Sequence, residues 1–591
     1  MDYSKLVGLY EQIDSTTKRL AKTALIADFL KHTDKENIGQ VILLLQGRLF
    51  PEWSTQKLGV AARLVIKAIS TATGSSASAV EDEWKKTGDI GTVAFNLVKK
   101  KSQNTLFSHN LTVKKVFDNL KKLAELEGEG TVDKKVGLIA ELLTSAEPKE
   151  AKYIVRTVIE DLRVGIGAGT LRDAIARAFL FSDKDYSYDE ELNNFEPKDR
   201  EAYNNMTAAV QTAYDRTNDF AVVAEAAVKG LHELEKLEVM PGIPVKVMLA
   251  PKESSIAEGF ERVGKPGVIE FKYDGFRIQA HKFQDSGKEK IELFTRRLEP
   301  VTKQFPEVVD FVRNYVDGKS FILDCEAVGF DRKTGKYVAF QNISQRIRRK
   351  YNISEMAKTL PVELNVFDIL YYNGANMISE PYEKRWQTLK KIIKEKKHEL
   401  VLAQHLITAD MKEAEEFYQK SLDAGNEGVM MKNKDSPYKP GARVGYMIKI
   451  KPVMETLDLG IVGAEWGTGK RAGWLTSFIL ACQDDDGRFL EIGRVGTGFK
   501  ELEESGGATF EELTKLLKPF IIEEKGKIAT IKPEIVIEIK FEEIQKSPTY
   551  SSGFALRFPR LAKIRDDRGI NDIEKLSRIK KMYDEQRERS K

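Results

Sequence analysis

The feature of this sequence that most limits its fold is a change of hydrophobic periodicity near residues 240–245. Before this point, apolar side chains recur at helical spacing, with hardly any alternating runs. After it, short alternating or continuous apolar segments predict strands. Pro241 and Pro244 separate the two patterns, since proline cannot continue a helix and restricts the residue before it. The chain is therefore expected to fold as several domains of different class.

With 591 residues, the chain is too long for a single hydrophobic core. We expect an all-α domain at residues 1–240, an α+β domain at residues 241–452 and a third domain at residues 453–591 with a basic C-terminal tail. Turn-separated short strands in the last third predict a five-stranded OB-fold β-barrel, a fold that binds nucleic acid.

The composition excludes several classes of protein. No run of about 18 apolar residues occurs, and the N-terminus lacks the pattern of a signal peptide, so we expect an intracellular protein with no membrane partner. The two cysteines, Cys325 and Cys482, can build neither a disulfide framework nor a cysteine-rich zinc site.

A lysine at the end of an apolar strand opens the predicted α+β domain. Residues 267–271 form the strand, Lys272 follows it, and Asp274-Gly275 makes a turn into a second, alternating strand. Taken alone, this stretch has two equally good interpretations: Lys272 is a functional residue, or the stretch is a hairpin whose lysine points into water. Strand-end loops nevertheless commonly hold catalytic groups.

Other charged residues interrupt apolar strands of the same domain. Alternation over residues 446–451 places Lys449 and Lys451 on one face, where two ammonium groups repel each other unless an anion such as phosphate lies between them. Glu326 and Glu427 occupy apolar strands or their ends, where carboxylates are costly unless a cation or metal pairs with them. The pattern predicts a nucleophile, phosphate-binding cations and two carboxylates for a hard divalent ion. The set comprises Lys272, Arg277, Arg296, Glu326, Glu427, Lys449 and Lys451.

In the helical domain, a glycine-rich turn at residues 163–169 precedes a predicted helix. Thr170 is placed to cap that helix, and the free N–H groups near Gly167 suit a phosphate flanked by Arg163 and Arg172. The segment is either a contact to the DNA backbone or a plain joint between two helices. It is not a nucleotide P-loop, because no Gly-Lys-Ser/Thr follows.

Taken together, these motifs resemble the covalent nucleotidyltransferases, and among them the ATP-dependent DNA ligases of the archaeal and eukaryotic replicative type. The resemblance runs nearly end to end. It is carried by Lys-Tyr-Asp-Gly (272–275), Thr-Arg-Arg (295–297), Leu-Asp-Cys-Glu (323–326), Val-Phe-Asp (366–368), Glu-Gly-Val-Met (427–430), Ile-Lys-Ile-Lys (448–451), Arg-Phe-Pro-Arg (557–560) and Asp-Asp-Arg (566–568). The segments 48–51 and 163–172 also resemble this subgroup.

The resemblance implies that Lys272 attacks the α-phosphate of ATP, that the AMP passes to the 5′-phosphate of a nick, and that the 3′-hydroxyl then displaces it to seal the strand. Neighbouring positive charge on Lys449 and Lys451 would favour the neutral amine. The implied contacts are Glu270 and Phe367 to the adenine, Arg277 and Glu326 to the ribose, Arg296, Arg443, Lys449, Lys451 and Arg557 to phosphate, and Glu326 with Glu427 to Mg²⁺ or Mn²⁺. Arg560 and Lys563 are expected to reach the outer phosphates with Arg557 when the C-terminal barrel closes.

The implied partners are nicked duplex DNA and a sliding clamp, bound by a monomer in the cytoplasm of a prokaryote or archaeon, or wherever chromosomal DNA lies. Gln103, Leu106 and Phe107 form either a clamp-docking peptide or a loop that packs under itself.

Three other functions explain fewer features of the sequence. An mRNA capping guanylyltransferase or RNA ligase gives no reason for 240 helical residues. An NAD-dependent ligase normally carries a four-cysteine zinc site, which two cysteines cannot supply. A non-catalytic DNA-binding scaffold would not need Lys272, Glu326, Glu427, Lys449 and Lys451 together.

Overall fold

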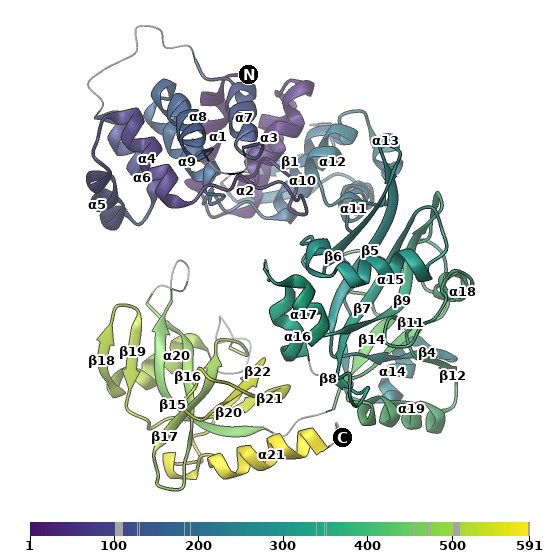
Figure 1. The fold of residues 1–591 in the computed structure, drawn as a ribbon. Helices are drawn as coiled ribbons and strands as arrows, with labels where there is room; N and C mark the ends of the chain where they lie inside the picture. The colour runs from purple at the N-terminus through teal and green to yellow at the C-terminus, as the bar shows by residue number, and fades with distance from the viewer. Residues whose placement is uncertain are drawn as a thin grey trace.

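The computed structural model describes residues 1–591 except 101–109, 127, 129, 183, 190, 339, 348, 350, 453–455, 468–470, 472, 500–508 and 589–591. Helices dominate the first part of the chain, mixed sheets and helices the central part, and strands the C-terminal part (Figure 1). In Figure 1 the central part lies at the right, below the helical part, and the C-terminal part lies at the lower left.

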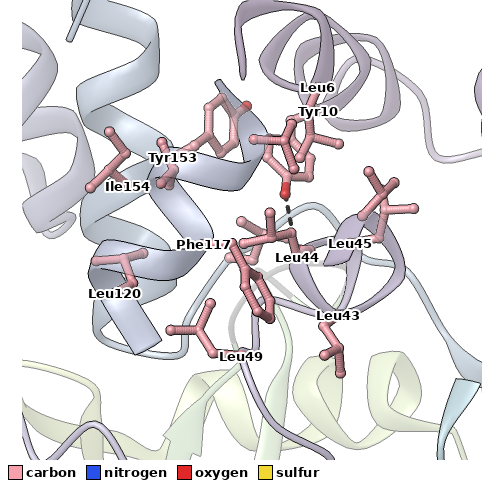
Figure 2. Packing of buried hydrophobic residues seen from close by; sticks show 14 of the residues in the cluster. Leu6, Tyr10, Leu43, Leu44, Leu45, Leu49, Phe117, Leu120, Tyr153 and Ile154 are labelled. Atoms are coloured by element: carbon pink, nitrogen blue, oxygen red, sulfur yellow. Dashed lines mark hydrogen bonds between the residues drawn. The ribbon is translucent and has the colours of Figure 1, made fainter. Parts of the chain in front are cut away.

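The helical part buries one large apolar core. Tyr10 and Tyr153 pack in it with ring centroids 4.8 Å apart, and the Tyr10 hydroxyl donates to the carbonyl of Leu44 at 2.9 Å (Figure 2). The helices are α1 (Tyr3–Asp14), α2 (Arg19–Lys31), α3 (Ile38–Leu45), α4 (Ala62–Thr73), α5 (Ala77–Thr87), α6 (Ile90–Lys99), α7 (Val113–Lys122), α8 (Val132–Ser145), α9 (Pro148–Val158), α10 (Ala168–Phe179), α11 (Arg200–Thr217), α12 (Phe220–Ala227) and α13 (Leu231–Glu235).

The expectation of an all-α domain is wrong at one place. Strands β1 (Tyr186–Asp189) and β2 (Asn194–Pro197) form an antiparallel hairpin between α10 and α11. Phe195 of this hairpin is buried against Arg177 of α10, whose guanidinium carbon lies 3.5 Å from the ring centroid. The hairpin thus belongs to the packing of the helical part.

Two sheets build the central part. One has the strand order β12-β4-β13-β14-β3, and the other has the order β10-β9-β7-β5-β6, with β11 beside β9 and β8 beside β7. Their strands are β3 (Lys252–Glu253), β4 (Gly267–Lys272), β5 (Phe276–Asp285), β6 (Lys288–Thr295), β7 (Phe321–Phe330), β8 (Tyr337–Val338), β9 (Val362–Tyr372), β10 (Ala375–Asn376), β11 (Leu400–Leu402), β12 (His405–Thr408), β13 (Gly428–Asn433) and β14 (Met447–Ile450).

Helices pack against both central sheets. Ile256 and Phe260 of α14 and Ala414 of α19 share an apolar cluster with β4, β13 and β14. Tyr382 and Trp386 of α18 are buried in the core of the other sheet. The helices are α14 (Ile256–Val263), α15 (Pro306–Tyr315), α16 (Phe340–Ile347), α17 (Ile353–Thr359), α18 (Tyr382–Ile392) and α19 (Met411–Asp423).

The C-terminal part is rich in strands. Its main sheet has the order β17-β16-β15-β19-β18, with β20 pairing both β15 and β23, and a separate hairpin joins β21 to β22. Among the residues described, these pairings do not close into a barrel. The elements are β15 (Leu457–Trp466), β16 (Leu475–Gln483), β17 (Phe489–Val495), α20 (Phe510–Leu517), β18 (Ile521–Lys525), β19 (Ile528–Ile531), β20 (Val536–Lys540), β21 (Glu543–Lys546), β22 (Phe554–Arg557), β23 (Arg560–Ile564) and α21 (Leu576–Glu588).

None of the described helices is both long enough and apolar enough to cross a bilayer.

Candidate functional site

Lys272 ends strand β4, at the point where the neighbouring strand β13 begins. Lys272 faces Gly428 in the antiparallel register, and the backbone N–H of Glu427 donates to the Lys272 carbonyl at 2.8 Å. Gly428 has a φ of +136°, and a Cβ at this position would lie 2.2 Å from the carbonyl oxygen of Ile450. Only glycine fits here. This close packing of β13 against β14 brings Glu427 beside Lys272.

The turn after Lys272 is equally confined. A Cβ on Gly275 would lie 2.4 Å from the carbonyl oxygen of Ala327 in β7. The bulky Phe276 that follows is buried, with its ring centroid 4.8 Å from that of Phe305. The Lys272 side chain is only 22% exposed, so it does not point into open water.

With the exception of Lys563, the residues predicted from the sequence to contact nucleotide or metal line one cavity of about 1090 Å³. The cavity brings together the ends of β4, β13 and β14 from one central sheet with β5, β7 and β9 from the other. The predicted residues in its lining are Glu270, Lys272, Arg277, Arg296, Glu326, Phe367, Glu427, Arg443, Lys449, Lys451 and Arg557.

Glu427 is the centre of the charge network in this cavity. Its Oε2 lies 2.5 Å from the Nζ of Lys272 and 2.7 Å from the Nζ of Lys451. Burial would raise the pKa of Glu427, but the charges and hydrogen bonds of these two lysines lower it to about 2. Glu427 is therefore ionised at neutral pH and pairs directly with the predicted nucleophile.

The pKa of Glu326 is shifted in the opposite direction. Burial, helped by the nearby charges of Glu427 and Asp324, raises the pKa of Glu326 to about 8, although Lys272 and Arg277 act to lower it. The two carboxylates predicted to share a metal ion thus differ in ionisation at neutral pH. A cation between them would stabilise the ionised form of both.

Among the described residues, no group of three or more His, Cys, Asp or Glu side chains is arranged to hold a metal. Two carboxylates are nevertheless a suitable set for a hard cation such as Mg²⁺, which keeps several waters and binds one or two carboxylates together with substrate phosphates. Glu326 and Glu427 fit this kind of site.

Further cations surround Lys272. Burial lowers the pKa of Lys449, and the charges of Lys451, Lys272 and Arg296 lower it further. Lys451 behaves differently: burial would lower its pKa, but its contacts with Glu427 and Glu542 raise it. The cavity therefore concentrates positive charge in the way that a polyphosphate requires.

The opposite end of the cavity is aromatic and holds a buried ion pair. Glu270 lies 2.6 Å from the Nζ of Lys432 and accepts a hydrogen bond from the Tyr382 hydroxyl. The Lys432 ammonium lies 5.2 Å from the centroid of the Phe367 ring. This end offers a flat apolar surface and polar groups of both signs, as a purine base needs.

Lys432 and Tyr382 were not predicted from the sequence. Lys432 follows the apolar residues 429–431, and a buried lysine at the end of such a run is a signal that could have identified it. Tyr382 begins helix α18, about a hundred residues after Glu270, and no local pattern connects the two.

Arg277, predicted to bind the ribose, lines the cavity but has protein partners. Its Nε donates to Asp324 at 2.6 Å, a second nitrogen bonds the other oxygen of Asp324, and the Tyr438 hydroxyl lies 2.8 Å away. Asp324 is fully buried. Arg277 therefore has a structural role in addition to any contact with a ligand.

The C-terminal part contributes to the same cavity. Arg557 lies 3.0 Å from Glu543, 3.4 Å from Asp274 and 3.6 Å from Glu427. Phe558 and Arg560 also line the cavity.

Lys563, which was expected to join Arg557 and Arg560, does not line this cavity. Its Nζ lies 3.9 Å from Glu538, its cross-strand neighbour in the sheet of the C-terminal part. This structure therefore does not bring Lys563 to the cavity, and its contact with the outer phosphates on closure stays a prediction.

The glycine-rich turn of the helical part differs in detail from the prediction. Helix α10 begins at Ala168 with Gly167 as its N-cap, so Thr170 lies inside the first turn, is buried and does not cap the helix. Arg163 pairs with Asp161 at 2.7 Å, and Arg172 pairs with Asp173 at 2.6 Å. The start of α10 therefore has no side-chain cap, and the two arginines that flank it in the sequence each have a carboxylate partner. The proposed clamp residues Gln103, Leu106 and Phe107 lie outside the described part of the chain.

Comparisons with known proteins cover the whole chain. Residues 247–451 match the family described as "ATP dependent DNA ligase domain", residues 2–176 match "DNA ligase N terminus", and residues 471–568 match "ATP dependent DNA ligase C terminal region". A DNA ligase of Nanoarchaeum equitans is 47% identical over 590 residues, which is 99% of each chain. A DNA ligase of Thermococcus fumicolans is 41% identical over 585 residues, covering 99% of this chain and 98% of the relative.

Among solved structures, the one named "Pmar-Lig_PreS3" aligns with a TM-score of 0.52 at 17% identity, over 95% of this chain and 99% of that chain. At this identity the likeness concerns the fold.

Proposed function

This chain belongs to the ATP-dependent DNA ligases, enzymes that seal nicks in DNA at the expense of ATP, and from that premise we propose that Lys272 is its nucleophile. The observation that carries the proposal is the position of the Lys272 Nζ, 2.5 Å from Glu427 in a cavity that is also lined by the other predicted nucleotide contacts except Lys563.

In the first step, the Lys272 amine attacks the α-phosphorus of ATP. A P–N bond forms, the bond from that phosphorus to the bridging oxygen breaks, pyrophosphate leaves, and the nitrogen releases a proton to solvent. Attack requires a neutral amine with a free lone pair. The Lys272 ammonium must therefore lose a proton, and with it the ion pair with Glu427, before the bond forms.

In the second step, an oxygen of the 5′-phosphate at a nick attacks the phosphorus of the lysine-bound AMP. The P–N bond breaks and the Lys272 amine is restored. In the third step, the 3′-hydroxyl attacks the 5′-phosphorus, loses its proton, and AMP leaves as the phosphodiester forms. Each step is an in-line displacement, for which positioning and charge stabilisation are the main contributions of the protein.

The nucleotide is proposed to lie with its base at the aromatic end of the cavity. Glu270 and Phe367 contact the adenine, and Glu326 with Arg277 holds the ribose. The charged end holds the phosphates through Arg296, Arg443, Lys449, Lys451 and Arg557. In support of this placement, Phe367 lines the same cavity as Lys272, Lys449 and Lys451.

The divalent ion is proposed to be Mg²⁺, with Mn²⁺ as an alternative, held by Glu326 and Glu427. When bound, it would offset negative charge on the reacting phosphate. The carboxylate oxygens of these two residues, together with phosphate and water, are the hard donors that such an ion prefers.

We further propose three domains: a helical DNA-binding domain at residues 1–240, an adenylation domain at 241–452 and an OB-fold domain at 453–591. Strands β15, β16, β17, β19 and β20 are the candidates for the five barrel strands, because β15 pairs with β16 on one side and with β19 and β20 on the other.

Nicked duplex DNA is the proposed substrate of a monomeric enzyme that acts in replication and repair, wherever chromosomal DNA lies. Arg163, Gly167, Thr170 and Arg172 are proposed to contact its backbone, with the N–H groups at the start of α10 facing phosphate. Gln103, Leu106 and Phe107 are proposed to dock a sliding clamp.

A nick-sealing assay with labelled nucleotide tests this function. Wild-type protein, Mg²⁺ and ATP should join a nicked duplex, and α-labelled ATP alone should label the polypeptide through a bond that survives alkali but not hot acid. Lys272→Ala should do neither. Labelling by GTP or NAD in place of ATP would instead support a capping enzyme or an NAD-dependent ligase.

A further inference from the structure

The β21–β22 hairpin of the C-terminal part presents two carboxylates beside Arg557. Glu543 faces Arg557 in the antiparallel register, and the backbone N–H of Glu542 donates to the Arg557 carbonyl at 2.9 Å. In Figure 1 this hairpin lies on the side of the C-terminal part that faces the central part. Of these residues, Glu542 and Arg557 line the nucleotide cavity.

Glu542 contacts a lysine that belongs to the phosphate-binding set. Its Oε2 lies 2.8 Å from the Nζ of Lys451, which also lies 2.7 Å from Glu427. The Lys451 side chain is 14% exposed and that of Glu542 is 34% exposed, so water screens the pair only in part. Lys451 thus has a carboxylate partner from each of the two parts of the chain that form the cavity.

The pair is charged at neutral pH. Burial would raise the pKa of Glu542, but its hydrogen bond with Lys451 and the charge of that lysine lower it. The contacts with Glu427 and Glu542 likewise keep Lys451 protonated. An ionised carboxylate therefore occupies the side of Lys451 that faces the C-terminal part.

A nucleotide triphosphate needs the same ammonium group. A carboxylate and a phosphate that compete for one cation in a partly buried cavity also repel each other. A phosphate bound at Lys451 is therefore opposed by the charge of Glu542, whereas a ligand without phosphate is not.

On the basis of the proposed function, we infer that Glu542 is an internal competitor of nucleotide phosphate, which occupies Lys451 while no nucleotide is bound and lowers the affinity of the site for ATP. This assigns to Glu542 a role in setting nucleotide affinity, while the chemistry stays with Lys272. Glu543, whose contact is with Arg557, lies on the same hairpin but does not share this cation.

The test is equilibrium binding of α,β-methylene-ATP, which cannot adenylate the enzyme, to the full chain after pyrophosphate has removed any bound AMP. Glu542→Gln keeps the size of the side chain and removes its charge. We expect this variant to bind the analogue about 1.5- to 5-fold more tightly, the range that a partly exposed ion pair supplies. Glu538→Gln is the matched control, because Glu538 pairs with Lys563 outside the cavity.

Adenosine, which has no phosphate, separates competition from a general effect on the cavity. Its affinity should be the same for wild type and Glu542→Gln. The inference is overturned if Glu542→Gln binds the analogue as wild type does or more weakly, or if adenosine binding tightens equally. Labelling of Lys272 by ATP in the wild type tests the proposed function separately, so either conclusion can fail alone.

Discussion

Replacement of Arg277 by methionine tests how the cavity is held together. Arg277 forms a two-pronged contact with Asp324, and Asp324 is fully buried between β5 and β9. Arg277→Met keeps most of the apolar stem and removes the charge. The Asp324 carboxylate then stays in the interior without the arginine. Of Arg277 and Tyr438, only the Tyr438 hydroxyl remains as its donor, at 3.0 Å.

Removal of one partner of a buried ion pair typically costs about 3–5 kcal/mol, because the remaining charge loses its compensation. We expect the free energy required to open β5 and β7 locally to fall by this amount. Amide hydrogen exchange measures this free energy. The loss should be smaller at low pH. Burial already raises the pKa of Asp324 while Arg277 opposes this effect; without Arg277 the pKa rises further, and protonation relieves the cost as the pH falls.

The double variant Arg277→Met/Asp324→Asn is the matched control. It removes both charges, so most of the lost stability should return. A single variant that loses less than about 1 kcal/mol, or a double variant no more stable than the single, would contradict the reasoning. If Arg277 also binds the ribose, the double variant should regain stability, but its rate of adenylation should stay below that of the wild type.

Three further expectations concern the metal, the base and DNA. Because the pKa of Glu326 is about 8, a cation must displace its proton, and the apparent affinity for Mn²⁺ by electron paramagnetic resonance should rise about tenfold from pH 7 to pH 9; Glu326→Gln should abolish this rise. Phe367→Ala should weaken binding of α,β-methylene-ATP about 3- to 10-fold, whereas Phe367→Tyr should retain it, as expected for loss of ring stacking; equal weakening by both would argue against stacking. Arg163→Ala and Arg172→Ala should each weaken binding to nicked duplex in fluorescence anisotropy, less so at high salt; an effect independent of salt would argue against phosphate contacts.

Local pattern was sufficient to predict much of the central part. The apolar run ending at Lys272, the glutamate before Gly428 and the alternation that places Lys449 beside Lys451 each describe a strand or its end, and strands are recognisable within a few residues. The order of these motifs led to the family. The cavity they form requires the pairing of β4 with β13 and of β13 with β14.

Contacts between distant segments could not be predicted in this way. Tyr382 reaches Glu270 from helix α18, and Glu542 reaches Lys451 from the C-terminal part. No periodicity or spacing in the sequence indicates either contact. The same holds for the β1–β2 hairpin, whose Phe195 is buried by its contact with Arg177 rather than by an alternating pattern within a larger sheet.

Thr170 illustrates a different source of error. Threonine is a favoured N-cap, and its place after a glycine-rich turn suggested that role. The N-cap is instead Gly167, three residues earlier, and the helix begins at Ala168. Residue preferences identified the helix but did not fix its first residue, which is the usual uncertainty of helix boundaries predicted from sequence.

We propose that one covalent bond forms, between the Nζ of Lys272 and the α-phosphorus of ATP. Mass spectrometry of the protein after incubation with ATP and Mg²⁺, followed by peptide mapping under alkaline conditions that preserve a P–N bond, detects this bond. We expect one added AMP, located on Lys272, removed by pyrophosphate and absent from Lys272→Ala. AMP on any other residue, or on the Lys272→Ala variant, would show that Lys272 is not the nucleophile.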